Sequence, residues 1–121
     1  MYYAFRYNCY SSVDFAPYGN TMSWASIHIE KLLAGQSVSF RPKGNSMVGR
    51  ISSGQLCTVV PIDNIEINCD DIVLCKVHGN VYLHIVTAIQ NGRYQISNNR
   101  GHINGWTSRA NIFGILTNVS D

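Results

Sequence analysis

Hydrophobic residues after position 37 form short runs, some continuous and some alternating with polar residues, as is typical of β-strands. Two of the junctions between runs, His78-Gly79-Asn80 and Asn91-Gly92, have the composition of β-hairpin turns. The polar segment 97–109 (SNNRGHINGWTSR) predicts a long loop before the last run. The runs that we expect to form strands are 37–40, 55–61, 71–77, 81–89, 93–97 and 111–119.

One helix is expected, over residues 24–33. Ser23 is a suitable N-cap, and Gly35 can end the helix in a left-handed conformation. Its apolar side consists of Ala25, Ile29, Leu32 and Leu33. Many short strands with Gly and Asn turns, together with one helix, predict a mostly antiparallel coiled sheet closed as a small barrel or sandwich.

The first 22 residues are rich in Tyr and Phe but follow neither the helical nor the strand period for long. We interpret residues 1–22 as an aromatic extension and residues 23–121 as a single domain, because 121 residues are too few for two ordinary domains. The extension could pack on the domain or on a partner, or be loosely ordered.

Composition narrows the classes of function. Hydrophobic residues make up 45% of the chain, which argues against disorder. The net charge is only +2, so neither a nucleic acid nor an anionic membrane is expected as partner. No apolar run approaches the roughly 18 residues that span a bilayer, and no secretion signal is evident. We therefore expect a soluble cytoplasmic protein.

The four cysteines do not indicate a metal site. Three of them lie in or beside predicted strands, where Cys is a small buried hydrophobe. The nearest cluster, formed by Cys69, Cys75 and His78, lacks ligand spacing and a fourth ligand. No phosphate-binding or dinucleotide motif occurs either, so we expect reduced thiols, no metal and no cofactor.

The loop that contains Gly44 and Ser46 is the strongest candidate for chemistry. A glycine permits a tight turn, on which the Ser46 hydroxyl could be exposed, although a turn serine that bonds its own backbone is an alternative. A serine needs a base, and His84, in the middle of a predicted strand, suits that role better than Lys43 or Lys76. The alternative for His84 is a half-buried strand residue that is satisfied by a hydroxyl or carbonyl.

Four segments follow one another in order, at 42–56, 70–74, 97–100 and 112–116. They resemble the boxes of LexA-type repressors and signal peptidases. The resemblance covers roughly residues 37–119 and implies their β fold and serine-peptidase chemistry. His84 stands where the family usually has its catalytic lysine, as in the signal peptidases of the endoplasmic reticulum, which pair serine with histidine. The matching segments are 42–56 around the Ser46-Met47 pair, 70–74 (DDIVL), 97–100 (SNNR) and 112–116 (IFGIL).

The resemblance implies a site in which Ser46 is the nucleophile and His84 the general base. Asn98, or alternatively Asn99, would orient the imidazole. Backbone N–H groups of the loop around Gly44, Asn45 and Met47 would receive the oxyanion. The expected reaction is hydrolysis or self-cleavage of a peptide that is bound along a sheet edge. Its rate should rise with pH around an apparent pKa near 6.5, the ordinary value for histidine.

A protein-binding module without catalysis is the second hypothesis. It would present the N-terminal aromatics and the polar loop before the last strand to a protein partner. Small stand-alone members of this superfamily are expected in phages, other mobile elements or bacteria. The loop residues that we assign to a substrate or partner are Asn99, Arg100, His102 and Trp106.

Overall fold

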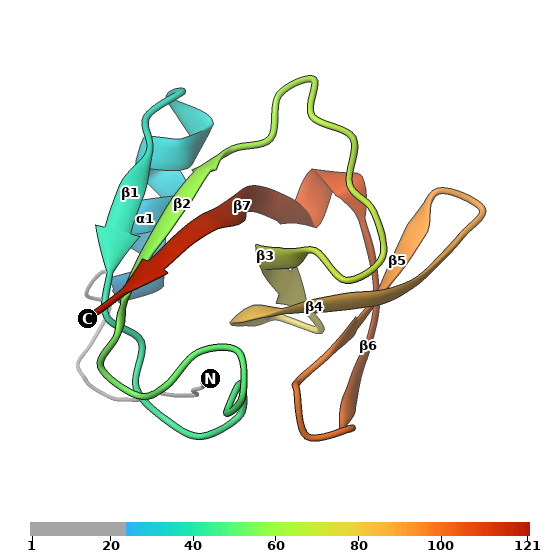
Figure 1. The fold of residues 1–121 in the computed structure, drawn as a ribbon. Helices are drawn as coiled ribbons and strands as arrows, with labels where there is room; N and C mark the ends of the chain where they lie inside the picture. The colour runs from blue at the N-terminus through green and yellow to red at the C-terminus, as the bar shows by residue number, and fades with distance from the viewer. Residues whose placement is uncertain (1–23) are drawn as a thin grey trace.

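The computed structural model describes residues 24–121, so the predicted extension 1–22 lies outside the described residues. Residues 24–121 form one α-helix and seven strands, with a short 3-10 helix before the last strand (Figure 1). The elements are α1 Trp24–Leu33, β1 Val38–Phe40, β2 Leu56–Pro61, β3 Ile72–Val77, β4 Asn80–Gln90, β5 Arg93–Ser97, β6 Ile103–Ser108, η1 Arg109–Asn111 and β7 Ile112–Ser120.

All seven strands belong to one sheet, in the order β1-β2-β7-β3-β4-β5-β6, and every neighbouring pair is antiparallel. The mostly β, antiparallel prediction is therefore confirmed. The sheet is not closed, because β1 and β6 remain its two edges, and neither a barrel nor a sandwich is confirmed. The sheet is nevertheless strongly coiled (Figure 1). Its edge strand β6 comes back toward β3, where the Thr107 hydroxyl donates to the Lys76 carbonyl oxygen at 2.8 Å.

Helix α1 has the predicted bounds, and it is terminated at Gly35 as predicted. Gly35 has a φ of +86°, which a residue with a Cβ rarely adopts. The N–H of Gln36 donates to the Lys31 carbonyl at 2.9 Å, and that of Gly35 donates to the Leu32 carbonyl at 3.0 Å. This Schellman arrangement satisfies carbonyls that the helix end would leave unpaired.

The apolar side of α1 is narrower than predicted. Ala25 and Leu32 are buried, but Leu33 is 72% exposed. Successive residues of a helix point about 100° apart, so the face that buries Leu32 against the sheet directs Leu33 away from it.

Both predicted hairpin turns are confirmed. His78 and Gly79 have φ values of +50° and +84°, and Asn91 and Gly92 have +53° and +74°. Two consecutive positive φ values are typical of type I′ turns, whose twist matches that of the flanking strands. These turns set the registers of the β3–β4 and β4–β5 hairpins and hence the position of His84 along β4.

The prediction of a loop over 97–109 is wrong for its second half, because residues 103–108 form the edge strand β6. Asn104 and Gly105 are weak strand formers, but pairing with β5 satisfies the backbone groups of this segment. Trp106 consequently lies on β6 opposite Gln95 and is half-buried rather than displayed on a loop.

Two hydrophobic clusters hold the sheet in shape. The first includes Leu32 of α1 together with Leu83 and Ile85 of β4. The second includes Val86 and, at its border, Tyr82. His84 lies between them on β4, and its ring stacks on that of Tyr82 with centroids 4.8 Å apart. His84 is thus fixed in the packed interior.

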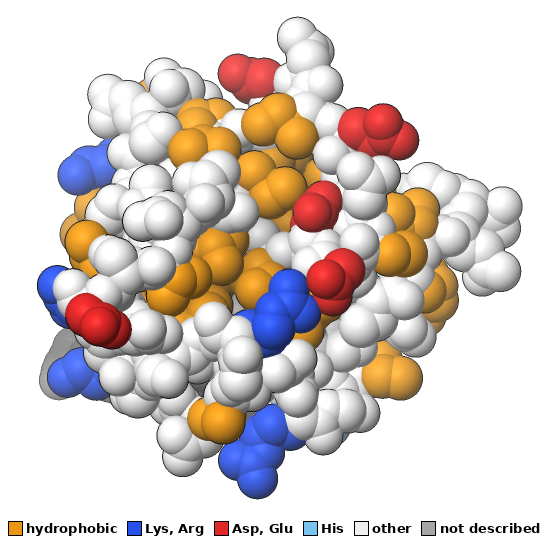
Figure 2. Space-filling model, viewed as in Figure 1, with side chains coloured by type: hydrophobic (Ala, Val, Ile, Leu, Met, Phe, Trp, Pro, Cys, Tyr) orange, Lys and Arg blue, Asp and Glu red, His pale blue; other side chains and the backbone are white. Residues whose placement is uncertain are grey.

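The surface combines apolar and charged areas. Hydrophobic side chains gather in the middle of the face seen in Figure 1, with charges of both signs around them (Figure 2). No helix within residues 24–121 has both the length and the apolar character needed to cross a membrane.

Candidate functional site

Ser46 and His84, 38 positions apart in sequence, meet in the structure. The Ser46 Oγ lies 3.1 Å from Nε2 of His84, within hydrogen-bonding distance. Ser46 belongs to the segment between β1 and β2 and is half-buried, whereas His84 lies in the middle of β4 and is only 3% exposed. The structure therefore places together the two residues that the sequence suggested as nucleophile and base.

Tight backbone turns shape the segment that contains Ser46. Gly44 has a φ of +117°, and its N–H donates to the Ser53 hydroxyl at 3.2 Å. The Met47 carbonyl accepts hydrogen bonds from the N–H groups of Arg50 and Ile51 at 2.9 and 2.7 Å. The Met47 side chain is 5% exposed and belongs to the first hydrophobic cluster. Ser46 is thus held directly beside a residue that is anchored in the core.

Asn104 is the residue that orients His84. Its Oδ1 lies 2.7 Å from Nδ1 of the imidazole. Because a carboxamide oxygen only accepts, Nδ1 must carry the proton in this contact, which leaves Nε2 of the neutral ring with a lone pair. The Ser46 hydroxyl then donates to Nε2. Ser46, His84 and Asn104 thus form a chain of two hydrogen bonds. In this chain Nε2 accepts from the hydroxyl, as a general base requires.

Asn98, which was predicted to orient His84, has a different role. Its Oδ1 accepts hydrogen bonds from the N–H groups of Arg100 and His102 at 2.8 and 2.9 Å. Asn98 therefore shapes the turn between β5 and β6. The residue that contacts His84 lies six positions later, because that turn reverses the chain and β6 directs the Asn104 side chain at the ring.

Three other predicted residues occupy the same turn or strand, but no hydrogen bond between them and Ser46 or His84 side chains is found among the described residues. Arg100 and His102 are exposed, and Trp106 is half-buried on β6. Asn99 contacts the backbone of the Ser46 loop instead: its N–H donates to the Ser46 carbonyl at 2.8 Å, and its Nδ2 donates to the Val48 carbonyl at 2.7 Å.

Burial dominates the acid–base behaviour of His84. It lowers the pKa of the imidazole to about 3, because the charged form loses its hydration. The hydrogen bond to Asn104 opposes this shift, and the positive charge of His102 adds to it. The expected apparent pKa near 6.5 assumed an unshifted imidazole, whereas burial keeps His84 neutral throughout the physiological range and makes it a weaker base than an exposed histidine.

The N–H groups next to Ser46 are the candidate oxyanion donors. Within residues 24–121, no acceptor is found for the N–H groups of Asn45, Ser46 and Met47, whereas the N–H of Val48 already donates to the Asn45 carbonyl at 3.3 Å. An oxyanion that forms on a carbonyl attacked by Ser46 would find these donors close to its origin.

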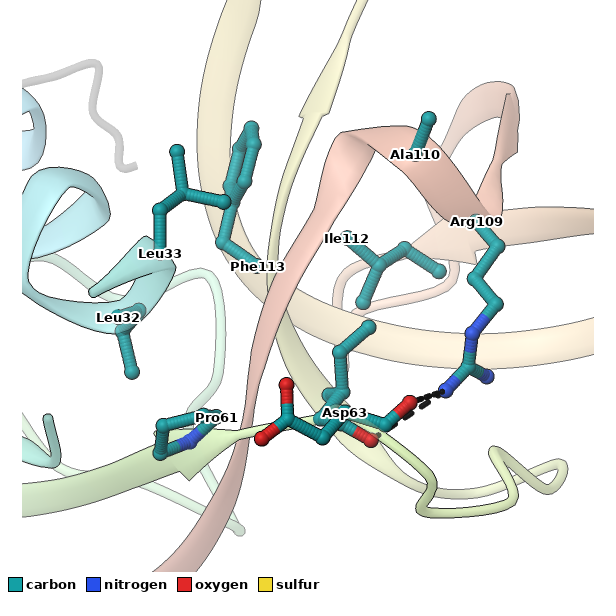
Figure 3. A pocket seen from close by; sticks show the side chains of 9 residues that line it. Leu32, Leu33, Pro61, Asp63, Arg109, Ala110, Ile112 and Phe113 are labelled. Atoms are coloured by element: carbon teal, nitrogen blue, oxygen red, sulfur yellow. Dashed lines mark hydrogen bonds between the residues drawn. The ribbon is translucent and has the colours of Figure 1, made fainter. Parts of the chain in front are cut away.

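A separate cavity of about 400 Å³ lies between the end of α1, the end of β2 and η1 (Figure 3). Arg109 closes one side, and its Nη2 donates to the carbonyls of Ile62, Asp63 and Ile65 at 3.3, 3.0 and 2.8 Å. The lining contains no Ser, Cys or His, so it supplies no hydroxyl, thiol or imidazole nucleophile. The lining residues are Leu32, Leu33, Pro61, Ile62, Asp63, Arg109, Ala110, Ile112 and Phe113.

The three cysteines within residues 24–121 do not take part in the site. Cys57 and Cys75 are buried, and burial raises the pKa of both thiols, that of Cys57 to about 12. Cys69 is exposed, and all three are free thiols. Among the described residues, no group of three or more His, Cys, Asp or Glu side chains is placed to hold a metal ion.

Comparison of the chain with protein-family models and with curated protein sequences finds no match.

Proposed function

We propose that this protein is a serine hydrolase that cleaves peptide bonds, in a substrate or in itself, through Ser46, His84 and Asn104. The observation that supports this proposal is the chain of two contacts, 3.1 Å from Ser46 Oγ to His84 Nε2 and 2.7 Å from His84 Nδ1 to Asn104 Oδ1. A hydroxyl and an imidazole so arranged, with a third group orienting the base, are the components of nucleophilic acyl transfer.

In the proposed reaction, Ser46 Oγ attacks the peptide carbonyl carbon while its proton passes to His84 Nε2. The carbonyl electron pair moves to the oxygen, which the N–H groups beside Ser46 stabilise. The intermediate then expels the amine, which takes the proton from Nε2, and an acyl ester remains on Ser46. Water, deprotonated by the same nitrogen, hydrolyses the ester and restores the Ser46 hydroxyl.

The peptide as substrate follows from the resemblance of the chain to LexA-type repressors and signal peptidases. We propose that the coiled sheet is the β fold of that superfamily. The contact between Thr107 of β6 and Lys76 of β3 supports this proposal, because it brings the far edge of the sheet back toward its centre. An extended peptide would add to an edge strand by main-chain hydrogen bonds.

The test is covalent labelling with a fluorophosphonate, which reacts with serines that a base activates. We expect the native chain to gain one phosphonyl group at pH 8 and the Ser46→Ala variant to gain none. Ser52→Ala is the matched control, because Ser52 is an exposed serine of the same loop. That variant should be labelled as fast as the parent.

Equal labelling of the parent and the Ser46→Ala variant would disprove the assignment of the nucleophile. A folded parent chain that is never labelled would favour the second hypothesis, a binding module that has kept the fold without turnover.

A further inference from the structure

We propose that Asn99 is a positioning residue, which holds the backbone of the Ser46 loop so that the Ser46 hydroxyl faces His84. This inference rests on the proposed hydrolase function and adds to it a residue that touches neither the hydroxyl nor the imidazole. It was not evident from the sequence, where Asn99 is one of several polar residues expected to contact a substrate or partner.

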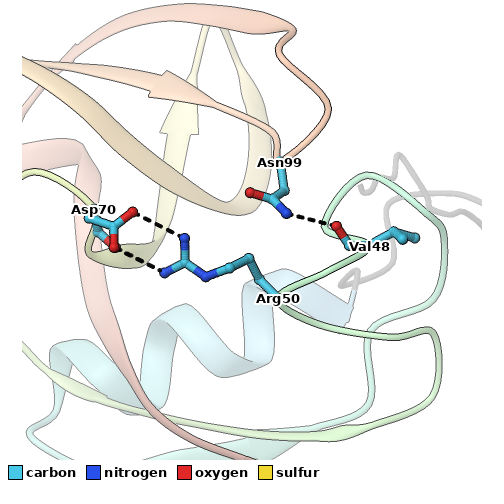
Figure 4. Close-up of polar contacts among 4 residues, drawn as sticks. All are labelled: Val48, Arg50, Asp70 and Asn99. Atoms are coloured by element: carbon cyan, nitrogen blue, oxygen red, sulfur yellow. Dashed lines mark hydrogen bonds and ion pairs between the residues drawn. The ribbon is translucent and has the colours of Figure 1, made fainter.

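Two hydrogen bonds from Asn99 bracket the nucleophile. Its backbone N–H donates to the Ser46 carbonyl at 2.8 Å. Its side-chain Nδ2 donates to the Val48 carbonyl at 2.7 Å, as Figure 4 shows. Because a peptide unit is planar, fixing the Ser46 carbonyl also fixes the direction of the Met47 N–H, one of the proposed oxyanion donors. Asn99 therefore determines the orientation of both the nucleophile's backbone and its neighbouring donor.

The backbone approaches Asn99 closely at one point. A Cβ added to Gly49 would lie 2.9 Å from Nδ2 of Asn99, and Gly49 has a φ of +98°. Only glycine combines this conformation with this proximity. The absence of a Cβ at Gly49 thus leaves the room that the Asn99 amide occupies.

The turn that contains Asn99, together with the strand β6 that follows it, contacts both the Ser46 loop and His84. Asn98 shapes the turn through the N–H groups of Arg100 and His102, Asn99 holds the Ser46 loop, and Asn104 on the following strand holds His84. Asn99 and Asn104, five positions apart, therefore contact the Ser46 loop and the base from one segment of the chain.

A second tether of the same loop is weaker. Arg50 pairs with Asp70 at 3.0 Å, but their side chains are 34% and 78% exposed (Figure 4). Exposed ion pairs contribute about 0–1 kcal/mol. Asn99 is exposed as well, but its two bonds reach main-chain carbonyls of the Ser46 loop, one of them that of Ser46 itself, so Asn99 acts nearer to the nucleophile than Arg50 does.

The experiment compares Asn99→Asp with Asn98→Asp in fluorophosphonate labelling of the full chain. Both variants add one negative charge with almost no change of shape. In Asn98→Asp the new carboxylate would still accept the two N–H bonds of the turn. In Asn99→Asp a carboxylate oxygen would replace the donor Nδ2 and oppose the Val48 carbonyl oxygen.

Displacement of a reacting group by about 1 Å costs on the order of 100-fold in rate. We expect the maximal labelling rate of Asn99→Asp to fall at least about tenfold with an unchanged half-saturating probe concentration. The Asn98→Asp variant should keep a rate within about threefold of the parent.

A purely structural role of Asn99 would lower the urea midpoint without changing the maximal labelling rate of the folded protein. Labelling of Asn99→Asp at the parental rate would overturn the inference and leave the proposed function intact. A parent that is not labelled would overturn both.

A pair of glycine variants keeps the test decisive if Asn99→Asp does not fold. Gly49→Ala places a methyl group against Nδ2 of Asn99, whereas Gly54→Ala, at a φ of +87°, meets nothing within 4 Å. Both variants strain the backbone, but only Gly49→Ala displaces the amide. The inference requires slow labelling in Gly49→Ala alone, and equal rates in the two variants contradict it.

Discussion

A carboxamide, rather than a carboxylate, accepts the Nδ1–H of His84 in this chain. It selects the tautomer that leaves Nε2 free for Ser46, but it offers no full negative charge to an imidazolium. Ser46 and His84 could be proposed from sequence, because a glycine-bent loop and a strand histidine match a known order of motifs. Asn104 could not be separated from Asn98, because both are asparagines of one polar segment and only the turn between them decides which reaches the ring.

At the scale of single residues, we predict that Asn104→Asp raises the pKa of His84 by about 1 to 3, because an adjacent carboxylate stabilises the imidazolium. The measurement is an NMR titration of the His84 ring in both proteins. Labelling of Ser46 should become faster in the variant at pH 8, since its base is stronger.

Asn98→Asp again serves as control, since its carboxylate would point into the turn rather than at Nδ1. It should change the pKa of His84 less than Asn104→Asp does. If the His84 pKa of Asn104→Asp stays at the parental value, the contact between Asn104 and His84 is not as described.

Elements that a few adjacent residues determine could be predicted from the sequence. Features that depend on partners distant in the sequence could not. The helix with its Gly35 terminus and the two I′ turns each follow from a few adjacent residues. Strand β6 contains Asn104 and Gly105 and forms because β5 offers it a partner. Strand β7 was predicted from its own apolar run, but its place between β2 and β3 depends on those distant partners.

At the scale of elements, we predict that Gly114→Ala destabilises the fold by about 1–3 kcal/mol. A Cβ there would lie 2.5 Å from Cγ1 of Val59 and 2.8 Å from the Val60 carbonyl oxygen, so β2 and β7 would have to separate. Urea unfolding measures the free-energy change.

The Val59→Ala background provides the control, because it removes one of the two clashing atoms. The cost of Gly114→Ala should be smaller there than in the parent chain. An equal cost in both backgrounds would show that the contact with Val59 is not the cause.

Over the whole molecule, two histidines link stability to pH. Burial lowers the pKa of His84 to about 3, and burial together with the nearby Lys31 charge lowers that of His28 to about 4. His28 lies on α1 and stacks on Phe40 of β1 with ring centroids 4.6 Å apart, so the two histidines report on different parts of the fold. The unfolded chain binds protons at both residues below about pH 6.5, whereas the native protein does not.

We predict that the free energy of unfolding is highest above pH 6.5 and falls as the pH decreases toward 4. Each histidine can contribute a slope of up to about 1.4 kcal/mol per pH unit. Urea unfolding between pH 7 and pH 5 measures the slope before most carboxylates titrate. His28→Phe, which keeps an aromatic ring against Phe40, should reduce the slope to roughly half. A stability that does not change over this range contradicts the described burial of both rings.

The measurement that bears most directly on the proposed chemistry is the identity of the residue that a fluorophosphonate modifies in the native chain. Peptide mapping by mass spectrometry should find the phosphonyl group on Ser46, since His84 and Asn104 activate this hydroxyl. A phosphonyl group on any other residue, or a folded chain that remains unmodified, would contradict the assignment of Ser46, His84 and Asn104 as a hydrolytic site.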